Sequence, residues 1–166
     1  MRPIDYALME YGEKEVVGTA NNARIVKYSH DIGNLWVNND EVAWCSEFVN
    51  WCLLQAGIHG TKSAVARSFL TWGEETKTPE VGDLVIFNRP PNPAAGHIGF
   101  FCNEHEGKIY TLGGNQNNEV NISGYDKSRV ISYRKVPRAV ESSNEVNSLL
   151  QQIISAQTTL INLLKK

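Results

Sequence analysis

Apolar and polar positions divide the chain into a helical first half and a strand-rich second half. Apolar residues recur at helical spacing over four stretches, residues 3–12, 22–30, 43–56 and 63–72. Short apolar runs predict strands at 84–87, 97–103, 108–113 and 130–136, with a hairpin turn at 104–107 and a Pro-rich loop at 89–96. Helices followed by antiparallel strands predict an α+β fold, with N-terminal helices packed on a small antiparallel sheet.

The C-terminal residues follow a different rhythm and predict a separate element. In residues 144–166, spacings of four and three residues alternate, close to a heptad repeat, through Val146, Leu150, Ile153, Gln157, Leu160 and Leu164. The pattern predicts a main domain over 1–136, a linker over 137–143 and an extra amphipathic helix over 144–166. This helix is expected either to form a homo-oligomer through residues 144–164 or to fold back onto its own domain.

Composition and charge narrow the classes of function. The chain has 166 residues, 42% of them hydrophobic, and a formal net charge of only −2. Without a long basic run, no nucleic-acid partner is expected. No stretch has the pattern of a signal peptide or the length of a membrane span. We therefore expect a protein synthesised as a soluble cytoplasmic chain without a signal peptide.

Three cysteines are present, and only one has the setting of a reactive thiol. Cys45 and Cys52 lie seven residues apart in one predicted helix, roughly 10 Å at about 1.5 Å per residue. A disulfide needs Cα atoms within about 7 Å, and this spacing also does not converge on a zinc ion. Cys52 and Cys102 are expected in the core. Cys45 begins its helix, where the dipole is expected to lower the thiol pKa, and is the predicted nucleophile.

A thiol nucleophile needs a base, and His97 is the best placed of four histidines. It begins a strand directly after a flexible loop, whereas His30, His59 and His105 are predicted at a helix end, in a loop and in a turn. The base in turn needs an acceptor that orients its ring. Asn115 and Gln116 are both candidates, because a regular turn would present Gln116 and a bulge would present Asn115.

Two acidic residues near these positions are interpreted as structural. Asp83 follows a glycine at the start of a strand and is expected to accept hydrogen bonds within a turn. Glu47 follows the predicted nucleophile by two residues and is expected to be a surface or supporting group.

Four segments in the same order resemble the CHAP and NlpC-type cysteine peptidases. They are Trp44–Trp51 (WCSEFVNW), Gly82–Phe87 (GDLVIF), Gly96–Phe100 (GHIGF) and Leu112–Gln116 (LGGNQ). The resemblance implies a papain-like fold and a thiol hydrolase that forms an acyl-enzyme, either a peptidase or an amidase, without a metal or other cofactor. It assigns Cys45 as nucleophile, His97 as base and Asn115 as orienting residue, with Gln116 as the alternative.

The resemblance also implies a substrate and a setting. It is closest to single-domain phage or prophage cell-wall hydrolases, so bacterial peptidoglycan is the expected substrate, reached after release by another factor or as part of a phage particle. Many such sequences carry Glu where this chain has Gly113, so the acidic member of the site is missing or supplied elsewhere. The alternative function is therefore a non-catalytic wall-binding or virion structural module on the same fold.

Overall fold

The computed structural model describes residues 1–18 and 20–138, in which helices precede an antiparallel sheet. The helices are α1 (Pro3–Met9), α2 (Ala23–Asp31) and α3 (Cys45–Gln55), with two short 3-10 helices, η1 (Ala66–Thr71) and η2 (Lys127–Arg129). The strands are β1 (Glu74–Thr76), β2 (Leu84–Arg89), β3 (Asn92–His105), β4 (Lys108–Gly113), β5 (Asn121–Asp126) and β6 (Val130–Lys135). The predicted α+β class is confirmed.

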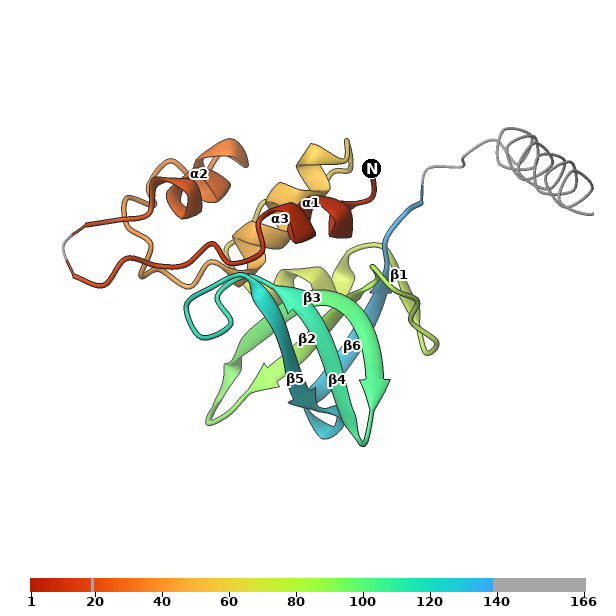
Figure 1. Ribbon diagram of the computed structural model, residues 1–166. Helices are drawn as coiled ribbons and strands as arrows, with labels where there is room; N and C mark the ends of the chain where they lie inside the picture. Colours follow the sequence, from red (N-terminus) through yellow and green to blue (C-terminus); the bar gives the residue numbers. More distant parts are fainter. Residues whose placement is uncertain (19, 139–166) are drawn as a thin grey trace, which may run out of the picture.

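The six strands form one curved sheet in the order β1-β6-β2-β3-β4-β5. All neighbouring strands run antiparallel, and the helices α1, α2 and α3 lie together on one side of the sheet (Figure 1). In the central pair of strands, His97 on β3 lies opposite Phe87 on β2. This register sets which residues share a face with His97.

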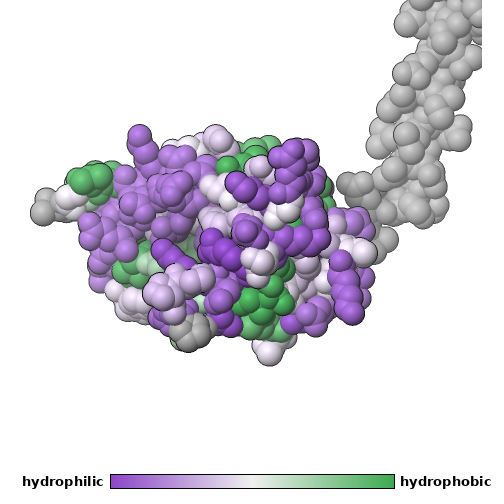
Figure 2. Space-filling model, turned by 90° about the horizontal axis from the view of Figure 1, so that it is seen from below, coloured by the Kyte–Doolittle hydropathy of each residue, from purple (hydrophilic) through white to green (hydrophobic). Residues whose placement is uncertain are grey.

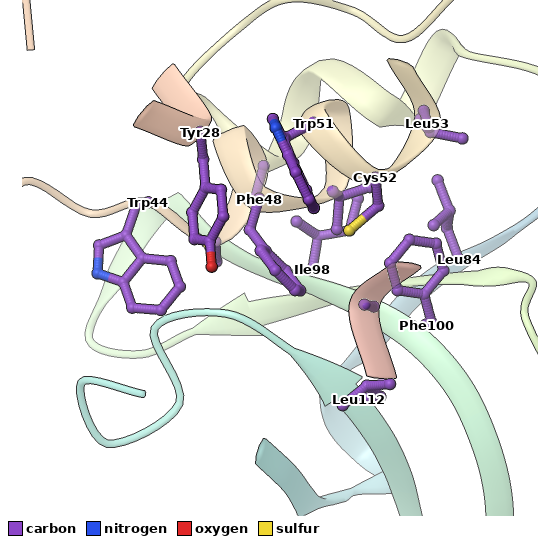
Figure 3. Close-up of a cluster of buried hydrophobic side chains, with 14 of the residues drawn as sticks. Tyr28, Trp44, Phe48, Trp51, Cys52, Leu53, Leu84, Ile98, Phe100 and Leu112 are labelled. Atoms are coloured by element: carbon purple, nitrogen blue, oxygen red, sulfur yellow. The ribbon is translucent and has the colours of Figure 1, made fainter. Parts of the chain in front are cut away.

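Helix α3 is the central element of the core. Its residues from Cys45 to Leu53 are buried on every side, because α1, α2 and the sheet all pack against it. Figure 3 shows Phe48 and Cys52 of α3 pointing toward Ile98 and Phe100 of β3. The sequence predicted helical spacing of apolar residues over 43–56, and the structure also buries polar residues of the first turns, Ser46, Glu47 and Asn50.

A second, smaller core lies on the other face of the sheet. Val85, Phe87 and Ile109 form its fully buried centre, and the partly buried Tyr125 and Tyr133 pack against it. Side chains of a strand alternate between faces, so His97 shares this face with Phe87, while its neighbour Ile98 points toward α3. The His97 side chain therefore lies beside Phe87 and Tyr125 of this smaller core.

Several element boundaries differ from the predictions. The predicted helix over 63–72 is a 3-10 helix of six residues, Ala66–Thr71. The predicted loop over 89–96 is a tight turn at Pro90 and Pro91, after which Asn92 already pairs with Arg89. Strands β1 and β5 were not predicted, because Glu74–Thr76 is very short and β5 alternates half-buried and exposed residues that are mostly polar.

The C-terminal predictions fall mostly beyond the described part of the chain. Strand β6 ends at Lys135, and the predicted helix over 144–166 lies outside the described residues. In residues 1–18 and 20–138, no helix is long and apolar enough to cross a membrane. The underside of the molecule, where the strand turns lie, is mainly hydrophilic with smaller hydrophobic patches (Figure 2).

Candidate active site

Cys45 is the first residue of α3, and its thiol is enclosed by protein. The side chain belongs to the main core, and the residue is only 4% exposed. The backbone of Ile98, the residue directly after His97, lies near the thiol and favours its thiolate form. The helix start and the histidine-bearing strand therefore meet at Cys45.

The expected lowering of the Cys45 pKa is wrong. Burial raises the pKa of this thiol, and hydrogen bonds from the backbone of Ile98 and Ser46 oppose the shift without reversing it. The helix start does supply N–H groups near the sulfur, but the loss of water around the thiolate outweighs them. Cys45 is thus a neutral thiol at rest, and a base must remove its proton during the reaction.

His97 lies on β3 and is 5% exposed. Its imidazole stacks on Phe87 at 6.2 Å between ring centroids and lies 5.0 Å from the ring of Tyr125. Burial lowers the pKa of His97 to about 4, and the nearby Arg89 and Arg129 act in the same direction. The imidazole is therefore neutral at physiological pH, which leaves one ring nitrogen free to accept a proton.

The orienting acceptor of His97 in this structure is Gln116. Its Oε1 lies 3.1 Å from Nε2 of His97 and also accepts a hydrogen bond from Thr111 Oγ1 at 3.0 Å. Its Nε2 donates to the backbone oxygens of Thr111 and Asn121 at 3.2 and 2.6 Å. Because the amide N–H groups are used in this way, Oε1 must face the histidine, and Nε2 of His97 must carry a proton.

Asn115 was the residue assigned by the resemblance, and it takes a different position. Its backbone is in the left-handed region, with φ of 54°, and its side chain is half-buried. The structure brings Gln116, rather than Asn115, within hydrogen-bonding distance of His97.

Gly113 explains how the Gln116 amide can reach the imidazole. A Cβ atom at position 113 would lie 3.2 Å from Oε1 of Gln116 and 3.3 Å from the backbone oxygen of Ile98. The Gln116 amide thus fills the space beside Gly113, where the sequence resemblance implied an acidic residue. The buried partner of His97 at this point is a neutral amide instead of a carboxylate.

Tyr125 is a site residue that the sequence did not indicate. Its hydroxyl oxygen lies 3.2 Å from Nε2 of His97. Strand β5 was not predicted, because Asn121, Ser123 and Gly124 give this segment little β-propensity. One signal could have indicated this strand. Ile122 and Tyr125 are strand-favouring residues that follow a turn rich in asparagine.

The other singled-out residues lie away from this cluster. His59 and His105 are exposed, and His30 Nε2 contacts the backbone oxygen of Val37 at 2.7 Å. Asp83 is the predicted turn acceptor, since it receives hydrogen bonds from the backbone of Glu80 and Val136. In the part of the chain that the structure describes, no three His, Cys, Asp or Glu side chains are grouped closely enough to hold a metal ion.

Of the two roles expected for Glu47, a surface group or a supporting group, the structure contradicts the surface role. Its carboxyl is completely buried in α3, and Oε1 accepts a hydrogen bond from Asn34 at 3.3 Å. Burial raises the pKa of Glu47. The residue supports the packing of α3 instead of facing solvent.

A cysteine-headed helix packed on a histidine-bearing antiparallel sheet is the arrangement that the sequence resemblance to CHAP and NlpC-type peptidases implied. Residues 37–115 match the model of the CHAP domain family. The matched segment spans just under half of the chain, contains Cys45, His97 and Asn115, and ends one residue before Gln116. The match confirms the resemblance to CHAP-type peptidases and supports a peptidoglycan-related hydrolase family.

One similar solved structure is described as "similar to lipoprotein, NLP/P60 family", from Staphylococcus aureus subsp. aureus Mu50. The two proteins are 18% identical, with a TM-score of 0.48, and the alignment covers 82% of this chain and 41% of that chain. The chain thus spans less than half the length of that protein. A search of curated proteins found no match.

Proposed function

We propose that this protein hydrolyses a peptide or amide bond of bacterial peptidoglycan, with Cys45 as nucleophile and His97 as general base. The observation that carries the proposal is the hydrogen bond between Nε2 of His97 and Oε1 of Gln116. With the proton held on Nε2, the lone pair of His97 lies on Nδ1. Nδ1 is then available to accept the proton of the Cys45 thiol, which lies near the backbone of Ile98, the residue after His97.

The first half of the reaction forms a thioester. As Sγ of Cys45 attacks the carbonyl carbon, Nδ1 of His97 takes the thiol proton. The oxyanion is held by the backbone N–H groups of Cys45 and Ser46, since Trp44 provides no side-chain cap for the start of α3. Nδ1–H of His97 then protonates the leaving amine, and the C–N bond breaks.

The second half releases the acid. Nδ1 of His97 removes a proton from water, which attacks the thioester carbonyl, and the C–S bond breaks. Sγ leaves as thiolate and recovers a proton from the imidazolium, so the site returns to its neutral starting state. Every proton transfer in this scheme passes through Nδ1, while Nε2 stays bonded to Gln116.

The choice of substrate is supported by the CHAP match over residues 37–115. The bond cut is proposed to lie in the stem peptide or at its junction with the glycan. A phage or prophage origin, with access to the wall through another factor or a phage particle, remains part of the proposal and rests on the sequence resemblance.

The test is digestion of purified peptidoglycan, with released fragments identified by mass spectrometry. Wild-type protein is expected to release fragments with new amino termini, and Cys45→Ala is expected to release none. Cys102→Ala is the matched control, because Cys102 is half-buried on β3 and is expected to leave activity unchanged. Equal digestion by wild type and Cys45→Ala would overturn the nucleophile assignment.

The alternative function, a non-catalytic wall-binding or virion module, is favoured by one observation. The Cys45 thiol is buried, and burial raises its pKa. A binder would sediment with peptidoglycan and release no new amines, so the same digestion separates the two functions.

A further inference from the structure

Tyr125 contacts His97 in a way that the proposed reaction has not yet used. It lies on β5, and its hydroxyl oxygen is 3.2 Å from Nε2 of His97, the nitrogen that also faces Gln116. Its ring centroid lies 5.0 Å from the imidazole and 4.8 Å from the ring of Phe87. The aromatic ring therefore covers one side of the imidazole while the hydroxyl reaches its Nε2.

The position of the Tyr125 ring is determined by a second contact. The guanidinium of Arg129 lies over the ring, 5.1 Å from its centroid. Nε of Arg129 donates to the backbone oxygen of Asn88 at 3.1 Å, which ties the arginine to the end of β2. Tyr125 is thus held between Phe87 and Arg129, and its hydroxyl has little freedom to leave His97.

The hydrogen-bond network decides the direction of the Tyr125 contact. Oε1 of Gln116 is an acceptor, so Nε2 of His97 carries the proton. The Tyr125 oxygen can then only accept from that same N–H group, and Nε2–H is shared between two neutral oxygens. Burial raises the pKa of Tyr125 to about 12, so the hydroxyl is a neutral phenol throughout the physiological range.

This arrangement bears on the acidic residue that the sequence resemblance led us to expect at position 113, where this chain has glycine. Because His97 is buried and its pKa is lowered to about 4, its cation is unstable unless Nε2–H has good acceptors. Gly113 supplies no side chain there, and the groups that face Nε2 are Gln116 and Tyr125. Arg89 and Arg129 are the charged neighbours that oppose the cation.

We propose that Tyr125 is a positioning residue, which shares Nε2–H of His97 with Gln116 and stabilises the imidazolium in place of a carboxylate. The proposal rests on the proposed function, since it concerns the cation formed when His97 takes the thiol proton. Tyr125 acts through His97, whose Nε2 lies 3.2 Å from its hydroxyl oxygen.

Tyr125→Phe tests the proposal, because it keeps the ring and removes only the oxygen. Loss of an acceptor for a charged donor is expected to slow wall hydrolysis (kcat/KM) roughly tenfold. The pH profile of Cys45 alkylation by iodoacetamide is the second measurement. In Tyr125→Phe, the midpoint of this profile is expected to move to higher pH, because the thiolate–imidazolium pair is less stable. The alkylation rate at pH 7 is expected to be about threefold to tenfold lower than in wild type.

Tyr133→Phe is the matched control, as this half-buried tyrosine packs against Phe101 on the same face of the sheet. It is expected to match wild type in both measurements. Superimposable alkylation profiles for wild type and Tyr125→Phe would overturn the proposal, and so would equal shifts in both tyrosine variants. If wild type digests no peptidoglycan but Tyr125→Phe still shifts the alkylation profile, the proposed function fails and the role of Tyr125 stands.

Discussion

The chemistry of single residues here depends on which nitrogen of His97 carries the proton. Gln116 is constrained by donating its own N–H groups to backbone oxygens, so it presents an acceptor to Nε2. A buried, neutral imidazole in this tautomer is a base at Nδ1 and a donor at Nε2. The site therefore begins from a neutral thiol and a neutral imidazole instead of an ion pair.

The first prediction concerns the orienting residue. Gln116→Ala removes the acceptor for Nε2 of His97 and is expected to lower the rate of peptidoglycan hydrolysis by roughly 10- to 100-fold, since a misplaced base reacts poorly. Asn115→Gly is the matched change at the alternative position, because glycine tolerates the left-handed backbone found there. It is expected to retain most activity. Full activity in Gln116→Ala, with loss in Asn115→Gly, would make Asn115 the orienting residue.

The second prediction is a pH dependence of stability. The folded pKa of His97, about 4, lies below the value near 6.5 of an unfolded histidine. Between these values, the unfolded chain binds a proton that the folded protein does not, so acidification favours unfolding. The contribution is fully present above about pH 6.5 and is lost as the pH falls toward 4, with a total of up to about 3 kcal/mol.

Urea unfolding of wild type and His97→Gln at several pH values measures this contribution. Other groups titrate in both proteins, so the informative quantity is the difference between their free energies of unfolding. The wild type is expected to lose more stability than the variant between pH 6.5 and 4.5. Parallel losses in the two proteins would contradict a lowered pKa at His97.

Among the elements, the sequence predicted those with strong periodicity and missed two others, the three-residue β1, whose partner β6 is distant in sequence, and the polar β5. Helix α3 and strands β2, β4 and β6 have apolar patterns that identify them directly. Strand β5 is polar and pairs only with β4, so its existence depends on the neighbouring strand more than on its own residues. Because Tyr125 lies on β5, its approach to His97, 28 residues away in sequence, could not be predicted.

The choice between Asn115 and Gln116 shows the same limit within the site. The sequence placed both residues after β4, but it did not show which side chain would face His97. That outcome depends on the left-handed backbone of Asn115 and on the space left by Gly113, both of which require the folded turn. The burial of Glu47 was missed because α1 and α2 cover α3 on the sides away from the sheet.

The third prediction tests how α3 packs against the end of β4. A Cβ atom at Gly114 would lie 2.4 Å from the Trp44 ring and 2.8 Å from Cβ of Phe48. Gly114→Ala is therefore expected to lower the free energy of unfolding by about 1–3 kcal/mol, as overpacked cores do. Thermal and urea unfolding measure the loss.

Relief of the clash serves as the control for this prediction. Trp44→Leu removes the ring atoms that meet position 114, so the double variant should lose less stability than the sum of the single changes. Additive losses would show that Gly114→Ala destabilises the protein for a reason other than contact with Trp44.

At the scale of the whole molecule, the described domain joins two cores across one sheet. Helix α3 brings Cys45 from the main core, and β3 brings His97 from the smaller core on the opposite face. The backbone of Ile98, directly after His97, lies near the Cys45 thiol, so the site depends on the sheet and helix layers packing together. A cavity of about 660 Å³ lies elsewhere, between the start of α1 and the end of β6.

The last prediction concerns residues 144–166, proposed as a separate oligomerisation element after a linker. Apolar residues at near-heptad spacing favour pairing between copies of the chain, since isolated helices of this length are marginal alone. Sedimentation of the full chain is expected to give a mass above the monomer, and a chain that ends at Glu141 is expected to be monomeric with unchanged wall hydrolysis. Equal monomer masses would contradict self-association and favour folding back, with the cavity lined by Val81, Val136 and Arg138 as the nearest docking surface to the end of β6.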